Sequence, residues 1–225
     1  MFIGHYGPAA ALAGGRIPLW HAAVAVQFLD ILWALLVLLG IEHARIVPGF
    51  TAANAFDLYD MPWTHSLPMA LLWSAAAAAV YGAARRAAGV AGAAVIGALV
   101  FSHWALDWLT HRPDLLLWFG GPKAGLGLWN DRMLSFALEI ALYAGGFALY
   151  LARTFPRGAI GRLLPLLVMA LALAAQIFAN FGPPPKSPEE AAHSAILAYA
   201  VFIALAIGVD ASRAAGRRSR APSKL

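Results

Sequence analysis

Three ionisable side chains, His103, Asp107 and His111, lie four residues apart near the end of a long apolar segment. In an α-helix this spacing places all three on one face. Ionisable groups are costly inside a membrane, and they mark functional sites by default. Imidazole and carboxylate groups together suit zinc, manganese or iron. We therefore expect this face to contribute to a metal site or to a proton path.

Other apolar segments contain polar side chains at a comparable depth. At a rise of about 1.5 Å per residue, Asp30 lies about 16 Å below the end of its segment, and Glu139 lies about 12 Å below the start of its own. His65 lies a few residues inside a further segment. We therefore predict that separate segments deliver ligands to one depth, in the outer half of the bilayer.

The composition is that of a membrane protein. Of the 225 residues, 61% are hydrophobic and only 12% are charged, whereas a soluble domain is about a quarter charged. The chain has no cysteine, which excludes disulfides and thiolate ligands, so a metal must be held by His, Asp or Glu. The net charge of +5 is spread over short loops and the tail, so it does not indicate nucleic-acid binding.

Six apolar stretches have the length of about 20 residues that a membrane span requires. They lie near residues 18–41, 62–82, 89–110, 132–152, 160–181 and 191–209. We predict an all-α, polytopic helical membrane protein with about six transmembrane helices and a short N-terminal membrane-dipping helix. Residues 1–212 would form a single domain, followed by a basic, disordered cytoplasmic tail over 213–225.

Basic and acidic residues alternate between the predicted loops. Arg85 and Arg86 lie between the second and third spans, further arginines lie between the fourth and fifth, and the tail is basic. The other loops hold most of the acids. The positive-inside rule then places the basic loops and the C-terminus in the cytoplasm, which predicts a multi-pass protein of the bacterial inner membrane.

The first residues are harder to place. Residues 2–13 are apolar but too short to span, and residues 14–18, Gly-Gly-Arg-Ile-Pro, are typical of a turn. A helical hairpin centred on this turn would hold His5 and Asp30 at similar depth. The alternative is a loose cytoplasmic N-terminus.

A catalytic metal site would keep one position for water, whose pKa the metal lowers towards neutrality. Glu139 or His111 would then handle protons. Ser66 would orient a ligand or a substrate phosphate, and Arg112 would bind an anionic headgroup. Structural alternatives remain: His111 could cap helix carbonyls, and Asp30 and Glu139 could pair with other spans as polar contacts.

Four short motifs resemble the YdjM-like membrane-bound metal-dependent hydrolases. They are Gly4-His5, Asp30 within residues 27–33, Thr64-His65-Ser66, and Ser102-His103 with Asp107, in the order of that family and over residues 4–115. The resemblance implies a metal site made of His5, Asp30, His65, His103 and Asp107. The family has two acids and a histidine where this chain has Asp30 alone, and the chain looks closer to a divergent branch that is labelled as permeases.

We therefore expect a metal-dependent hydrolase that acts on an ester or phosphoester of a lipid-like or small-molecule substrate. Its cofactor would be a divalent metal, zinc in the first place, with manganese or iron as alternatives. Membrane lipid is the expected partner, and no oligomeric state is predicted. A transporter that uses intramembrane His and Asp is the first rival, although the sequence shows no inverted repeat. The second rival is a scaffold whose metal only ties helices together.

Overall fold

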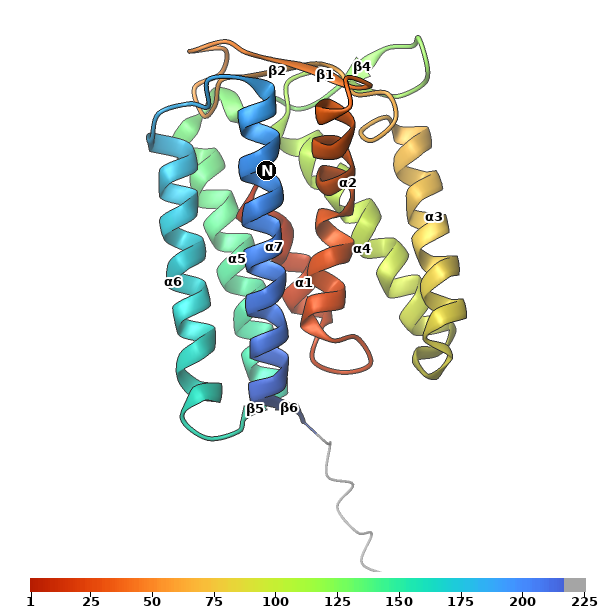
Figure 1. Cartoon of the computed structure of the whole chain (residues 1–225), viewed down its shortest axis with the longest axis vertical. Helices are drawn as coiled ribbons and strands as arrows, with labels where there is room; N and C mark the ends of the chain where they lie inside the picture. The colour runs from red at the N-terminus through yellow and green to blue at the C-terminus, as the bar shows by residue number, and fades with distance from the viewer. Residues whose placement is uncertain (217–225) are drawn as a thin grey trace, which may run out of the picture.

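Long helices that run roughly side by side form the protein, as the computed structural model of residues 1–216 shows (Figure 1). Six of them are long and apolar enough to cross a membrane, which confirms the all-α, polytopic architecture. In chain order the helices are η1 (Ile3–His5), α1 (Tyr6–Leu12), α2 (Leu19–Leu38), α3 (Leu67–Ala84), η2 (Arg86–Ala88), α4 (Gly89–Thr110), η3 (Leu128–Asn130), α5 (Arg132–Arg153), α6 (Ile160–Phe181) and α7 (Pro188–Ser212).

Short pairs of antiparallel strands lie at both ends of the bundle. They pair β1 (His43–Ile46) with β2 (Phe56–Asp60), β3 (Leu115–Leu116) with β4 (Lys123–Ala124), and β5 (Thr154–Pro156) with β6 (Arg213–Ala215). β1, β2 and β4 lie at one end, here called the hairpin end, and β5 and β6 lie at the other (Figure 1). The turns that contain Arg16 and Arg85 are at this second end, which we call the basic end.

The predicted disordered tail begins too early. Residues 213–215 are ordered as β6, which pairs with β5. The buried side chain of Arg213 donates to the hydroxyl of Thr154 at 2.8 Å and to the carbonyl oxygen of Gly161 at 2.6 Å. These bonds tie the end of α7 to the start of α6. The rest of the predicted tail, residues 217–225, lies outside the described residues.

Most helix boundaries agree with the predicted spans to within a few residues. α7 begins as its sequence predicts, with Ser187 accepting the backbone N–H of Glu190 at 3.2 Å and Pro188 in the first turn. The second span starts later than predicted, at Leu67. The preceding residues, 61–66, form turns rather than a helix, and these turns position His65.

The N-terminal segment is a buried half-helix. α1 lies in the half of the bundle nearer the basic end and packs against α5 (Figure 1). A Cβ atom on Gly7 would lie only 2.5 Å from the carbonyl oxygen of Leu142, and one on Gly146 would collide with the backbone of Gly7. Only glycine permits this approach, since the two backbones touch. The expected hairpin with α2 is confirmed, and the alternative of a loose N-terminus is wrong.

Replacing Gly146 by alanine is expected to lower the free energy of unfolding by about 1–3 kcal/mol, because the new methyl group overpacks the α1–α5 contact. Thermal unfolding of the purified protein in detergent would measure the loss. Gly145→Ala is the matched control, because a Cβ atom there meets nothing within 4 Å. Equal stability of the two variants would contradict the close approach of α1 and α5.

Candidate metal centre

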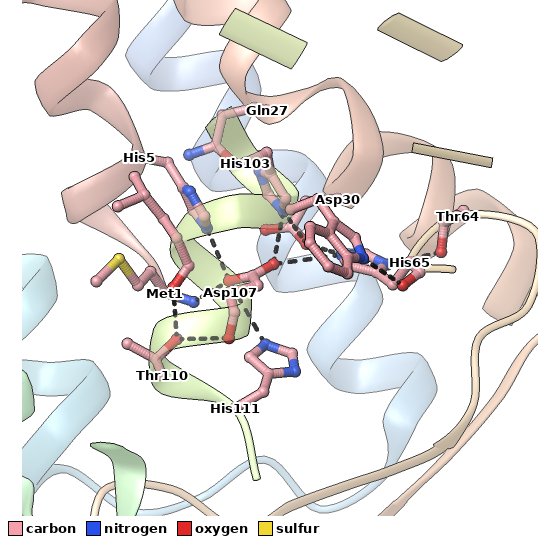
Figure 2. Close-up of polar contacts among 12 residues, drawn as sticks. Met1, His5, Gln27, Asp30, Thr64, His65, His103, Asp107, Thr110 and His111 are labelled. Atoms are coloured by element: carbon pink, nitrogen blue, oxygen red, sulfur yellow. Dashed lines mark hydrogen bonds and ion pairs between the residues drawn. The ribbon is translucent and has the colours of Figure 1, made fainter. Parts of the chain in front are cut away.

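Asp107 is the hub of a buried cluster of histidines and is only 1% exposed. Its Oδ2 atom lies 3.0 Å from Nε2 of His103 and 3.5 Å from Nε2 of His65. Its Oδ1 atom lies 3.1 Å from Nε2 of His5 and 3.5 Å from Nε2 of His111. Figure 2 shows these side chains pointing toward one another from separate parts of the chain. The predicted convergence of ligands from several segments is therefore present.

Asp30 completes the cluster from α2. Its Oδ1 atom lies 3.4 Å from Nε2 of His103 and 3.5 Å from Nε2 of His65, and its Oδ2 atom accepts the hydroxyl of Tyr199 at 2.6 Å. In the described part of the chain, two sets of side chains place ligand atoms within 4.8 Å of one another. The sets are His5, His103 and Asp107, and Asp30, His65 and His103.

Hydrogen bonds fix the orientation of two rings. Nδ1–H of His103 donates to the carbonyl oxygen of Val26 at 2.6 Å, and Nδ1–H of His111 donates to the carboxylate of Asp114 at 2.9 Å. A carbonyl and a carboxylate accept only, so in the neutral rings each Nε2 carries a lone pair. Nε2 of His103 is buried without a hydrogen-bond partner. Such lone pairs facing carboxylate oxygens require a proton or a metal cation between them.

His65 is oriented through a hydroxyl. Thr64 donates its hydroxyl to Oε2 of Glu42 at 2.6 Å, so it can only accept from Nδ1–H of His65, at 2.7 Å. Burial raises the pKa of Glu42, although hydrogen bonds from Thr64 and Trp63 counteract part of this effect. The sequence analysis counted Glu42 only as a loop acid. Its role depends on a turn that brings it beside Thr64, and no periodic pattern signals that contact.

Removing the Thr64 hydroxyl is expected to weaken metal binding about 10- to 100-fold, as the loss of an outer-shell partner typically does. Thr64→Val keeps the shape of the side chain but releases the His65 ring and removes the hydroxyl that donates to Oε2 of Glu42. Competition with a chromophoric zinc chelator would measure the affinity.

Thr110→Val is the control for this variant, because the Thr110 hydroxyl donates only to backbone carbonyls of α4. If both variants bind zinc as tightly as the wild type, Thr64 does not orient a ligand.

The carboxylates attract positive charge to the cluster. Although burial lowers the pKa of His65, hydrogen bonds and charges from Asp107 and Asp30 raise it to about 9. The α-amino nitrogen of Met1 also lies 2.7 Å from Oδ1 of Asp107. A divalent cation among these oxygens would satisfy the same demand for positive charge.

The proposed proton-handling residues both lie beside the cluster. Glu139 is 3% exposed, and its Oε2 atom accepts the backbone N–H groups of Phe2 at 2.7 Å and Gly4 at 3.2 Å. Glu139 thus anchors the N-terminal segment that holds His5. The ring of His111 stacks on Trp129 with 4.0 Å between centroids.

Ser66 and Arg112, the two predicted substrate-binding residues, do not line the cavity beside the cluster. The hydroxyl of Ser66 donates to the carbonyl oxygen of Pro62 at 2.6 Å, so it stabilises the turn before α3. The guanidinium of Arg112 lies over the ring of Phe50, 4.1 Å from its centroid. Both predictions assumed that a polar neighbour of a ligand faces the same space as the ligand, but these turns direct the side chains elsewhere.

A cavity of about 410 Å³ adjoins the cluster. Asp30, His65, Asp107, His111 and Glu139 line one part of it. The remaining wall is largely apolar and includes Trp33, Phe56, Leu58, Met61, Ala175, Phe178, Ala179, Ala191, Ala195 and Ala198. The cavity therefore extends from the histidines to the interface of α6 and α7.

Two amides in the cavity wall were missed by the sequence analysis. Gln176 and Asn180 of α6 are 1% and 8% exposed, and Nε2 of Gln176 donates to Oδ1 of Asn180 at 2.5 Å. Oε1 of Gln176 accepts the backbone N–H of Ile3 at 3.3 Å. Their spacing of four residues in an otherwise apolar span was the available signal, since it places both on one helix face.

Comparison with protein-family models, with curated proteins and with solved structures found no match. Any functional conclusion therefore rests on the side chains and their geometry.

The donor set fits a transition metal. Imidazole nitrogens and carboxylate oxygens are the ligands of zinc, manganese and iron sites in proteins that lack thiolates. Nδ1 of His65 and of His103 is held by an acceptor, the outer-shell arrangement that orients ligating histidines. The orphaned Nε2 of His103 is the position that a metal would satisfy. Buried His and Asp groups that can hold a metal ion are thus present, and they lie at the wall of a cavity.

Proposed function

We propose that this chain is a membrane-embedded, metal-dependent hydrolase that cleaves an ester or phosphoester bond of a lipid-like substrate. The observation that carries the proposal is the meeting of His65 and His103 Nε2 atoms with the Asp30 and Asp107 carboxylates at the wall of a cavity. A polar cluster with a purely structural role would need no such adjoining space.

Asp30, His65, His103 and Asp107 would hold the metal, with His5 completing the shell. The ring of His5 stacks on that of His103 with 3.7 Å between centroids. Zinc is the expected ion, and manganese or iron would fit the same donors. When bound, the metal supplies a Lewis acid and a water of lowered pKa.

Residues of this chain outside the metal shell would carry out proton transfer. Glu139 lines the cavity and can accept a proton from a water held there. With both ring nitrogens protonated, His111 can donate its Nε2–H to the leaving group, since Asp114 accepts its Nδ1–H and aims Nε2 toward the cluster. These roles follow the geometry, in which Glu139 and His111 lie on the same cavity as Asp107.

The cavity supports a lipid-like substrate. Its apolar wall lies between α6 and α7, both of which are candidate membrane spans. Alanines dominate this part of the wall, which leaves room for a hydrocarbon chain between the helices. The amide of Asn180 lies in the same wall and can hydrogen-bond a polar headgroup.

The proposed orientation places the site toward the outer face of a bacterial inner membrane. The cavity is lined by Phe56 and Leu58 of β2 at the hairpin end, whereas the arginine-bearing turns lie at the basic end. The positive-inside rule would put the basic end and the C-terminus in the cytoplasm. The resemblance to YdjM-like hydrolases agrees with this proposal.

Metal analysis combined with an ester panel tests the function. The purified protein is expected to bind about one zinc ion and to hydrolyse an amphiphilic ester or phosphoester, with activity lost to a chelator and restored by zinc. Solute uptake into vesicles that is insensitive to chelators would instead support the permease. Bound metal without turnover of any ester would support the scaffold.

A further inference from the structure

A second cavity, of about 420 Å³, lies between α2 and α3 and shares no lining residue with the cavity of the metal centre. Ile96 and Val100 of α4 contribute to its floor, and aromatic residues of α2 and α3 contribute to its walls. The rings of Phe28 and Trp73 approach to 5.7 Å between centroids. We call this space the α2–α3 groove. Because α2 and α3 are both candidate spans, the groove lies along a helix pair within the membrane.

One end of the groove is polar and the rest is apolar. Nδ1 of His21 and the hydroxyl of Tyr81 are 2.9 Å apart, and Arg85 lines the groove directly after α3 ends. Within residues 1–216, no Asp or Glu lines the groove. Asp210 contacts α2 near this end of the groove, and its carboxylate accepts the backbone N–H of Trp20 and the hydroxyl of Tyr150. The polar end of the groove therefore carries the guanidinium of Arg85, which has no acidic partner in the groove wall, and the rest of the groove is apolar.

The length of the groove matches one leaflet. Trp73 and Arg85 are twelve residues apart, which corresponds to about 18 Å along a helix, and one leaflet of the hydrocarbon core is about 15 Å thick. The polar end lies at the basic end of the bundle, which the positive-inside rule would place at the cytoplasmic leaflet. That leaflet carries anionic lipids.

We propose that the α2–α3 groove binds an anionic phospholipid, with one acyl chain lying along the apolar part of the groove that Phe28 and Trp73 line and the headgroup phosphate on Arg85. A guanidinium binds phosphate in bidentate geometry, and the Tyr81 hydroxyl or the His21 ring can supply a further hydrogen bond. The acyl chain would lie against the aromatic walls of the groove and would stay in contact with the bilayer along its length. This site is independent of the proposed hydrolase.

Native mass spectrometry of the full chain, titrated with phosphatidylglycerol or with phosphatidylcholine of the same acyl chains, tests the proposal. Phosphatidylglycerol is expected to bind about fivefold more tightly, because one arginine favours its net negative charge, whereas the choline ammonium neutralises the phosphate of phosphatidylcholine. Arg85→Gln should remove this preference. Arg86→Gln is the control, because Arg86 adjoins Arg85 but does not line the groove.

A second pair of variants tests the acyl-chain position. Ala77→Trp fills the groove and should weaken the binding of both lipids, whereas Ala79→Trp, at an exposed position of α3 outside the groove, should not. Thermal unfolding of each variant shows that it is folded. Equal affinity for the two lipids would overturn the proposed recognition of an anionic headgroup. Equal effects of Arg85→Gln and Arg86→Gln would overturn the proposal in favour of a general surface charge effect. Unchanged lipid binding by Ala77→Trp would overturn it as well.

Discussion

Replacing Asp107 by asparagine is expected to abolish metal binding while leaving the helices folded. The substitution removes a charged ligand that lies within 3.5 Å of four imidazole Nε2 atoms. The carboxamide N–H group can donate to one of these lone pairs, so the buried cluster stays hydrogen-bonded. Since the loss of outer-shell partners already costs about 10- to 100-fold, the loss of this ligand should exceed 100-fold in zinc affinity. Elemental analysis after dialysis against zinc would measure it.

Asp210→Asn is the matched control. Asp210 is also an aspartate in a candidate span, but it accepts from Trp20 and Tyr150 at the other end of the bundle. This variant should keep its full metal content. If Asp107→Asn retains zinc as well as Asp210→Asn does, the cluster is a set of structural ion pairs and not a metal site.

Filling the cavity between α6 and α7 is expected to remove turnover without removing the metal. Ala195 lines the apolar part of the cavity, and Ala195→Trp would occupy the space proposed for the substrate chain. The value of kcat/KM for a long-chain ester should fall at least about 100-fold, since remote binding energy supports the chemical step. The zinc content should stay at the wild-type value, because Ala195 does not belong to either ligand set.

Leu197→Trp is the control on the same helix. Leu197 is 66% exposed on the outer surface of α7, so the same bulky ring there leaves the cavity open. A short-chain ester should also be affected less than a long-chain one in Ala195→Trp. If both variants hydrolyse the long-chain ester at the wild-type rate, the substrate does not lie between α6 and α7.

The sequence predicted the positions of site residues correctly where the regular period of an α-helix determines them. His103 and Asp107 share a face because they are four residues apart, and the fixed rise per residue placed Asp30 at their depth. The turn around Arg16 correctly predicted that His5 returns to the same level. Asp30, His103 and Asp107 therefore met because regular helices convert spacing into position, whereas the turn before α3 positions His65.

The sequence did not predict the positions of side chains that turns and tertiary contacts determine. Ser66 adjoins His65 in the chain, yet its hydroxyl serves the turn before α3. Glu42 lies far from His65 in sequence, yet it supports that ring through Thr64. The amides of α6 reach the cavity only through the packing of α6 on the N-terminal segment. No periodic pattern encodes the contacts of Ser66 and Glu42, and the spacing of the two amides shows only that they share a face of α6.

The glycine contact between α1 and α5 bears on how the protein matures during synthesis. α1 has 7 residues, far fewer than the about 20 that a segment needs to partition into lipid as a span. Its docking surface on α5 includes Leu142 and Gly146, which the ribosome translates more than a hundred residues later. His5 therefore reaches its place only after α5 has entered the membrane, and a nascent chain that is arrested before α5 has no complete centre.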